Sequence, residues 1–259
     1  MPTSLVLSPK ECQGLSWYPP LGLAFAAHQA LLPLHAGELA KAAASMPIAL
    51  VKEGRDWRLA GVCGLTPGHN LFIKAGKWLG HYQPAWLATY PFHIVTVGEK
   101  GLVTFDRESG LSGEEGRVGE ESAEPFFDEQ GQMKEAVASR VEALKTSYGK
   151  QQATQKALSV LGTLGLVAPW PEALQRQLGL AIDGLHMVDE KALAQLDDES
   201  FLTLRRAQAL PIAYAVNLSL PQTHLLARLA RLNPGSVAAP ENLDSFFDSD
   251  EDLSFDFDG

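Results

Sequence analysis

Cysteine is scarce in this chain of 259 residues, which contains only Cys12 and Cys63. The two lie far apart and form neither a CxxC pair nor a Cys/His pattern with metal-ligand spacing. A disulfide framework and a CxxC-type zinc or redox site are therefore excluded. We expect both cysteines to be reduced, structural thiols.

Long apolar runs are also missing, since no segment reaches the roughly 18 residues that a membrane-spanning helix needs. The most apolar stretch, residues 21–34, is interrupted by His28 and Gln29. Only Lys10 precedes it as a basic residue, so the n-region of a cleavable secretory signal is absent. We expect a protein without a transmembrane segment that stays in the cytoplasm.

Basic residues are fewer than acidic ones: the chain has 21 Lys and Arg and 31 Asp and Glu, which gives a formal net charge of −10. Seven of the acids fall between residues 244 and 259, which leaves about −3 for the rest of the chain. Neither part has the basic stripe that binding to nucleic acid requires. We therefore expect no nucleic-acid partner.

Recognisable catalytic motifs are absent as well. There is no GxSxG nucleophile motif, no GxGxxG fingerprint and no Walker pattern. Cys63 sits in an apolar strand-like run, where a thiol usually packs rather than reacts. No two of the seven histidines have the i,i+2 or i,i+4 spacing common among metal ligands. We predict no catalytic residue, no metal site and no cofactor.

The chain does contain a strand-rich block from Met46 to Asp106. Its apolar runs Ile48–Val51, Leu59–Leu65 and Phe92–Val97 are rich in Ile, Val and Leu and are bounded by Gly or charge, as buried strands are. Gly54 and Gly98 mark hairpin turns at the ends of the first and third runs. Just before the block, residues 36–44 are Ala-rich and predict a short helix with Glu38 in its first turn.

The second half reads mainly as helices. Apolar residues at helical spacing from Met133 to Leu166 predict one or two amphipathic helices, with Tyr148-Gly149 as a possible break. Asp189 and Asp197 have the position of helix N-caps. Asp183-Gly184 predicts a hairpin turn between strands 178–182 and 185–188.

These patterns predict an α+β fold, in which a mostly antiparallel sheet from the N-terminal half is packed with helices from the C-terminal half. We expect one domain over residues 1–236, followed by an acidic, Phe-containing, disordered tail over residues 237–259.

Residues 68–91 are dense in aromatics, Gly and Pro. Trp78, Tyr82, Trp86 and Tyr90 recur at a spacing of four, which on a helix would place them on one face, although Pro84 breaks that face in two. They either cover the sheet or form a wall that binds peptide or protein. With Asn70 they are the candidate binding residues.

The tail is the second candidate binding element. Its dense acids repel one another, yet it holds four of the eleven Phe residues. A purely solubilising tail has little use for aromatics, whereas acids that steer and rings that anchor are typical of short binding motifs. The tail residues we expect to contact a partner are Phe246, Phe247, Phe255 and Phe257.

Taken together, several scattered stretches resemble the SapC family over about residues 20–230. The resembling residues are Pro47–Leu50, Gly64-Leu65, Asn70–Phe72, Trp78, Tyr82, Pro84-Ala85, Tyr90–Phe92, Pro125–Asp128, residues 189–202, Arg205-Arg206 and Leu210–Tyr214.

The resemblance implies a non-catalytic accessory or binding role beside peptide-modifying enzymes or outer-membrane, TonB-dependent uptake systems, with a protein or peptide as partner. Two alternatives stay open. One is an enzyme that modifies a peptide, with polar groups near Asn70, His81 and Asp106. The other, which the name of the family suggests, is a surface-layer (S-layer) component.

Overall fold

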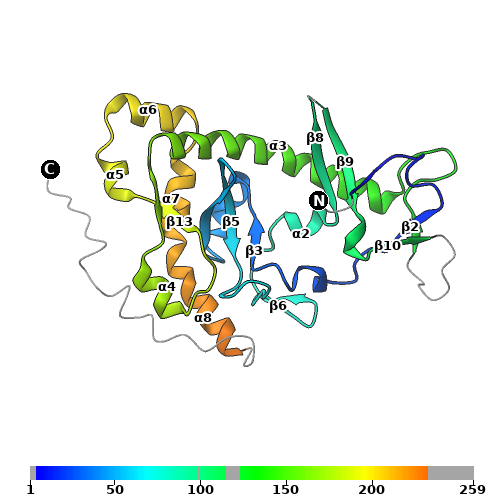
Figure 1. Cartoon of the computed structure of the whole chain (residues 1–259), viewed down its shortest axis with the longest axis horizontal. Coiled ribbons are helices and arrows are strands. Elements are labelled where there is room, and N and C mark those ends of the chain that lie inside the picture. The colour runs from blue at the N-terminus through cyan, green and yellow to red at the C-terminus, as the bar shows by residue number, and fades with distance from the viewer. Residues whose placement is uncertain (1–3, 99, 115–122, 233–259) are drawn as a thin grey trace.

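The computed structural model describes residues 4–98, 100–114 and 123–232. Every paired strand within these ranges is antiparallel, and the longer helices follow the strand-rich block, so the expected α+β class is confirmed (Figure 1). The strands form several small sheets rather than one. The tail, and with it Phe246, Phe247, Phe255 and Phe257, lies outside the described residues.

The largest sheet has five strands in the order β12-β13-β4-β5-β3. The hairpin β4–β5 at its centre is the one expected from the sequence, and Gly54 in its turn has a φ of 62°. Two of its strands come from the second half of the chain, and the sequence did not predict their place in this sheet. The strands are β3 (Leu31–Pro33), β4 (Ile48–Glu53), β5 (Asp56–Val62), β12 (Val167–Pro169) and β13 (Leu185–Val188).

A second sheet has three strands in the order β1-β9-β8, which are β1 (Ser4–Val6), β8 (Phe92–Val97) and β9 (Lys100–Asp106). A third joins β2 (Leu15–Trp17) to β10 (Ser112–Glu114) and β11 (Glu124–Pro125). The short ribbon of β6 (Ile73–Lys74) and β7 (Lys77–Trp78) completes the set.

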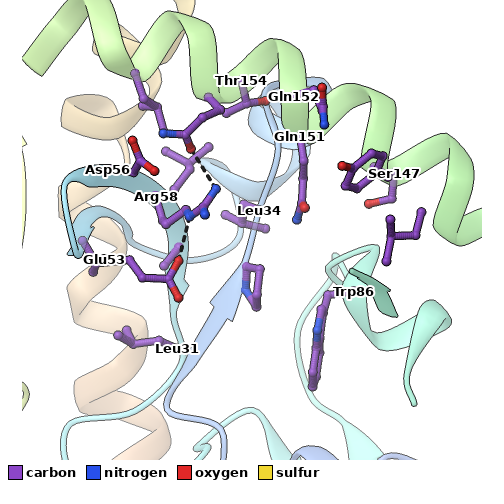
Figure 2. Close-up of a pocket in the computed structure, with 18 of the residues that line it drawn as sticks. Leu31, Leu34, Glu53, Asp56, Arg58, Trp86, Ser147, Gln151, Gln152 and Thr154 are labelled. Carbon is purple, nitrogen blue, oxygen red and sulfur yellow. Dashed lines mark hydrogen bonds and ion pairs between the residues drawn. The ribbon is translucent and has the colours of Figure 1, made fainter. Parts of the chain in front are cut away.

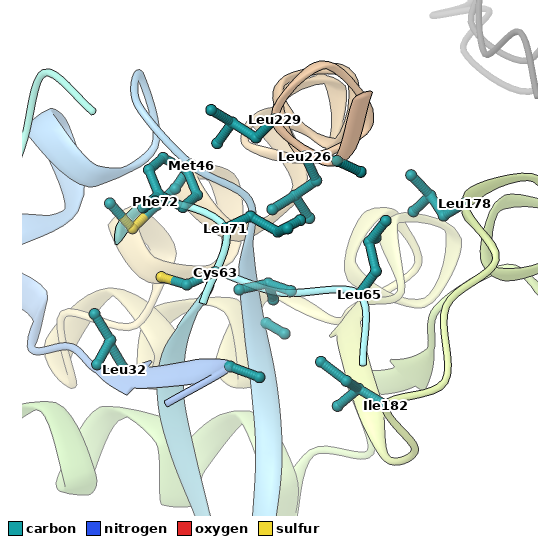
Figure 3. Close-up of a cluster of buried hydrophobic side chains, with 14 of the residues drawn as sticks. Leu32, Met46, Cys63, Leu65, Leu71, Phe72, Leu178, Ile182, Leu226 and Leu229 are labelled. Carbon is teal, nitrogen blue, oxygen red and sulfur yellow. The ribbon is translucent and has the colours of Figure 1, made fainter. Parts of the chain in front are cut away.

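Side chains alternate between the two faces of the β4–β5 hairpin, and each face has its own core. Ala49 and Val62 join a core that includes Phe72 and Leu226 (Figure 3). Ile48, Leu50 and Leu59 join a second core, with Leu158, Leu161, Ile212 and Val216 from the helices. The helices are α1 (Leu39–Ala42), α2 (Trp86–Thr89), α3 (Glu135–Thr163), α4 (Glu172–Leu178), α5 (Glu190–Ala194), α6 (Asp198–Arg206), α7 (Leu210–Leu218) and α8 (Thr223–Leu232).

Helix α3 is one uninterrupted helix of 29 residues, so the break considered at Tyr148-Gly149 does not occur. Its first half packs through Val137, Val141 and Leu144 against Phe92 and Phe105 of the second sheet, in a third core. Its last turns pack on the five-stranded sheet. The helix therefore bridges the two sheets (Figure 1).

One predicted hairpin is wrong. Leu178 does not begin a strand but ends α4, where Leu174 and Leu178 are both buried. Strand β13 pairs instead with β12, which precedes α4 in the chain, and with β4, which lies more than 100 residues earlier. The N-caps are confirmed: Asp189 and Asp197 accept hydrogen bonds from the amides of Ala192 (3.0 Å) and Ser200 (2.9 Å).

No helix in the described ranges is both long and apolar enough to cross a membrane.

Candidate functional site

A large cleft lies under the middle of α3, between the five-stranded sheet and the second sheet. Its volume is about 1290 Å³, above the roughly 300–1,000 Å³ usual for small-molecule pockets. One wall is formed by β3 and the β4–β5 hairpin, the opposite wall by α2 and β8, and α3 forms the roof. Figure 2 shows Leu34 and Arg58 on one side, Trp86 on the other, and Gln151 pointing down from α3 between them. We call it the α3 cleft.

Most of the α3 side chains that form the roof are polar. Between the two buried ends of the helix, Ser147, Gln151, Gln152, Thr154 and Gln155 line the cleft. Thr154 is buried, and its hydroxyl accepts the amide of Ala36 at 2.8 Å. The glutamines offer neutral amide donors and acceptors to whatever enters.

A chain of polar contacts joins the hairpin wall to the roof. Arg58 Nε donates to Glu53 Oε2 at 2.7 Å, and Arg58 Nη1 donates to Gln155 Oε1 at 2.9 Å (Figure 2). The ion pair is half exposed or more, so it contributes at most about 1 kcal/mol to stability. Its effect is mainly to orient side chains along the rim of the cleft.

Helix α2, which carries Trp86 and Thr89 into the cleft, is only four residues long and is held at both ends by charged side chains. At its start the amide of Ala85 donates to Glu38 Oε1 at 2.7 Å. At its end Arg140 Nη1 of α3 donates to the carbonyls of Ala88 and Tyr90, both at 3.1 Å. A helix this short is marginal alone, so these contacts fix the wall.

Glu38 is the centre of a buried polar network beside the cleft. Its side chain is 4% exposed. Oε1 also accepts the Tyr82 hydroxyl at 2.7 Å, and Oε2 accepts the His35 amide at 2.9 Å. The His35 ring, itself buried, has Nε2 3.4 Å from Oε2. Burial, and then the adjacent carboxylate, raise the pKa of Tyr82, so its hydroxyl remains a donor.

The cleft contains one histidine, His93 on β8. Burial lowers the pKa of His93, and the negative charge of Asp106 opposes the shift. Burial likewise lowers the pKa of His35; Glu38 opposes this and Lys150 adds to it. Both rings are therefore neutral at pH 7.

We predict that the protein loses stability as the pH falls from about 6.5. Below this ordinary histidine pKa the unfolded chain takes up protons at both positions, while folded His35 and His93 resist protonation. Each histidine then contributes a slope of up to about 1.4 kcal/mol per pH unit. Urea unfolding of wild type and of His93→Gln between pH 7.5 and 5.5 measures this. The variant should show the shallower decline, and an equal decline would contradict the prediction.

The candidate binding residues are only partly brought together. The Trp86 and Tyr90 rings lie 5.3 Å apart, and Tyr90 stacks on Phe25 at 4.5 Å. Trp86 alone among the five lines the α3 cleft. Tyr82 is engaged with Glu38, as described above. The helical face considered for all four aromatics does not form, because the helix begins only at Trp86.

The side chains of Asn70 and Trp78 make contacts that hold the fold together. Asn70 is buried; its Nδ2 donates to the Ala26 carbonyl at 3.2 Å and its Oδ1 accepts the Phe72 amide at 3.0 Å. Trp78 stacks on Phe72 at 5.0 Å. Neither these two nor His81 and Asp106 line the α3 cleft.

Both cysteines are free and buried. Burial raises the pKa of the Cys63 thiol far above neutrality, so the thiol is protonated and poorly nucleophilic. Within the described ranges no three His, Cys, Asp or Glu side chains are grouped so as to hold a metal ion.

Sequence reasoning misses the cleft, although a signal for it is present. The buried apolar residues of α3 stop at Leu144 and resume at Ala157, and residues 145–156 between them are polar except for Tyr148, Gly149 and Ala153. The possible break predicted at Tyr148-Gly149 falls inside this interval, which is instead the part of a continuous helix that covers the cleft. The sequence likewise presents Glu38 as a first-turn acid, and nothing local shows that it is buried.

A comparison with protein-family models matched the SapC family over residues 7–226. Searches of curated proteins and of solved structures found no match.

Proposed function

Because the chain belongs to the SapC family, we propose that it is a non-catalytic accessory protein that binds a peptide in the α3 cleft. The observation that supports the proposal most directly is the cleft itself. It is larger than a usual small-molecule pocket, and its walls and roof come from six elements, β3, β4, β5, α2, β8 and α3.

The lining suits a peptide. Leu31, Leu34, Trp86 and Ile94 offer apolar surface, while the α3 glutamines offer groups that hydrogen-bond amides. Charges of both signs, from Glu53, Asp56, Lys52, Arg58 and Lys156, lie towards the hairpin and favour neither a polyanion nor a polycation.

We place this role in the cytoplasm, beside enzymes that modify peptides or systems that take them up through outer-membrane, TonB-dependent receptors, as the family resemblance implies. The tail residues Phe246, Phe247, Phe255 and Phe257 extend the proposal as contacts to a protein partner. His93, a neutral base in the cleft, favours a peptide-modifying enzyme as the second candidate.

The proposal predicts that filling the cleft abolishes peptide binding. A phage-displayed library of random 12-residue peptides is selected on the full chain, and the enriched peptides are synthesised and titrated by calorimetry. Gln151→Trp places an indole in the cleft and should weaken binding at least tenfold. Ala153→Trp is the matched control, since Ala153 is exposed on the same helix outside the cleft and should leave affinity unchanged.

If no peptide is enriched, or if both variants bind as well as wild type, the proposed function is wrong. Mass spectrometry of the peptide after incubation separates the two candidates. An unchanged mass supports the accessory role, and a changed mass that depends on His93 would favour the enzyme.

A further inference from the structure

Strand β8 forms one edge of its sheet and faces the α3 cleft. In the order β1-β9-β8 it has a partner only on one side among the described strands. Its residues Phe92, Ile94 and Thr96 line the cleft. An edge strand presents a row of backbone groups that can pair with another chain.

The register shows which backbone groups are available. In an antiparallel pair, alternate residues point their N–H and C=O towards the partner strand. The Asp106 amide donates to the Pro91 carbonyl at 3.0 Å. Since His93 lies opposite Thr104 in this register, residues 91, 93 and 95 face β9. The amides and carbonyls of Ile94 and Thr96 face the other way.

The opposite side of β9 gives an independent check. The Leu7 amide donates to the Val103 carbonyl at 2.9 Å, so Val103 and Phe105 point towards β1. Thr104 and Asp106 then point towards β8. The hydrogen bonds on both edges of β9 therefore indicate the same register. In the described part of the chain, the backbone of Ile94 and of Thr96 makes no hydrogen bond to a third element.

The wall across the cleft also ends in an edge strand, β3, but that edge is a poor template. The Leu34 amide donates to the Leu59 carbonyl, and the Cys63 amide donates to the Ala30 carbonyl. Leu31 and Pro33 therefore turn outward. Pro33 has no N–H, and β3 spans three residues, so it offers one outward donor against three on β8, those of Phe92, Ile94 and Thr96.

We infer that a partner peptide binds in the α3 cleft as an extended strand that pairs with β8, through the backbone of Ile94 and Thr96, with the glutamines of α3 above it. This inference rests on the proposed function and adds the mode of binding. The occupant is an extended segment of another polypeptide. It is recognised through its main chain by addition to a sheet edge, and most of the α3 side chains that line the roof are neutral amides and hydroxyls, with Lys156 as the charged one.

The test is a scan of one enriched 12-residue peptide with single N-methylated residues, each titrated against the full wild-type chain. A strand paired with β8 uses every second amide, so methylation at alternate positions should weaken binding at least tenfold while methylation in between has little effect. Uniform tolerance, or losses without alternation, would overturn this mode and leave the proposed function intact. If no peptide binds, the proposed function itself fails.

A protein variant identifies the strand. Ile94→Pro removes an outward amide that makes no bond to β9, so an edge position should tolerate it. Ile94→Ala removes the side chain and keeps the amide. Ile94→Pro should weaken binding at least tenfold more than Ile94→Ala, and equal affinities would overturn the pairing with β8. Should Ile94→Pro not fold, the alternation in the methylation scan of the wild-type chain decides the question.

Discussion

Replacing Glu38 by alanine should destabilise the protein by about 3–5 kcal/mol, because three hydrogen-bond donors lose their acceptor and each buried donor left without one costs about 1–3 kcal/mol. The substitution removes the acceptor for the His35 amide, the Tyr82 hydroxyl and the Ala85 amide together. These donors are part-buried or buried, so solvent does not readily replace the carboxylate. The free energy of unfolding in urea measures the effect.

Two other variants calibrate the result. Glu38→Gln keeps one carbonyl oxygen and should cost about 1–3 kcal/mol, since its amide group then meets another donor. Glu53→Ala breaks the exposed pair with Arg58 and should cost less than about 1 kcal/mol. A Glu38→Ala protein that loses less stability than the Glu53→Ala protein would show that the network does not hold the fold. It would also show that the hydrogen bond from the Ala85 amide to Glu38 does not hold α2 in place.

The second large effect is expected at Gly64, which follows β5 and lies where two backbone segments come close together. A Cβ atom at this position would overlap the carbonyl oxygen of His69 and lie 3.1 Å from the Cβ of Ala30. A backbone carbonyl cannot move aside as a flexible side chain can. We expect Gly64→Ala to cost about 3 kcal/mol, the upper end for an overpacked core.

A second glycine provides the matched control. Gly149 lies inside α3, and a methyl group added there would have open space around it, with nothing within 4 Å. Gly149→Ala should therefore stabilise the protein by about 0.5–1 kcal/mol, because alanine is the better helix former. In urea unfolding, we expect Gly64→Ala to lower the free energy of unfolding and Gly149→Ala to raise it, although both substitutions add one methyl group. A Gly64→Ala protein as stable as wild type would mean that the loop after β5 can shift at little cost.

The sequence predicted best where neighbours in the chain decide the structure. The β4–β5 and β8–β9 hairpins depend on apolar runs that flank turns with Gly54 and Gly98, and both form. Asp189 and Asp197 cap helices as their positions suggested. The SapC resemblance was confirmed over most of the chain.

Prediction failed where the local sequence was compatible with two conformations, a strand or a helix in one place and a broken or a continuous helix in the other. Residues 178–182 were predicted as a strand because Asp183-Gly184 favoured a hairpin, but Leu178 ends helix α4 and residues 179–182 form no strand. Tyr148-Gly149 suggested a break in α3, yet the helix continues through both residues. Leu174 and Leu178 pack in a core with residues far away in sequence, such as Leu65 and Leu226, and the two ends of α3 are buried in two different cores.

By itself, then, the sequence determined the α+β class, two of the three predicted hairpins, the caps and the family. Each of these rests on contacts between near neighbours or on a pattern spread along the whole chain. Only the tertiary structure decided that Glu38 would meet Tyr82 and Ala85, and that a cleft would open between two sheets under α3. The cleft needs β3, β5, β8 and α3 to converge, and that convergence depends on how three cores pack around a single helix. Local sequence patterns do not predict that packing.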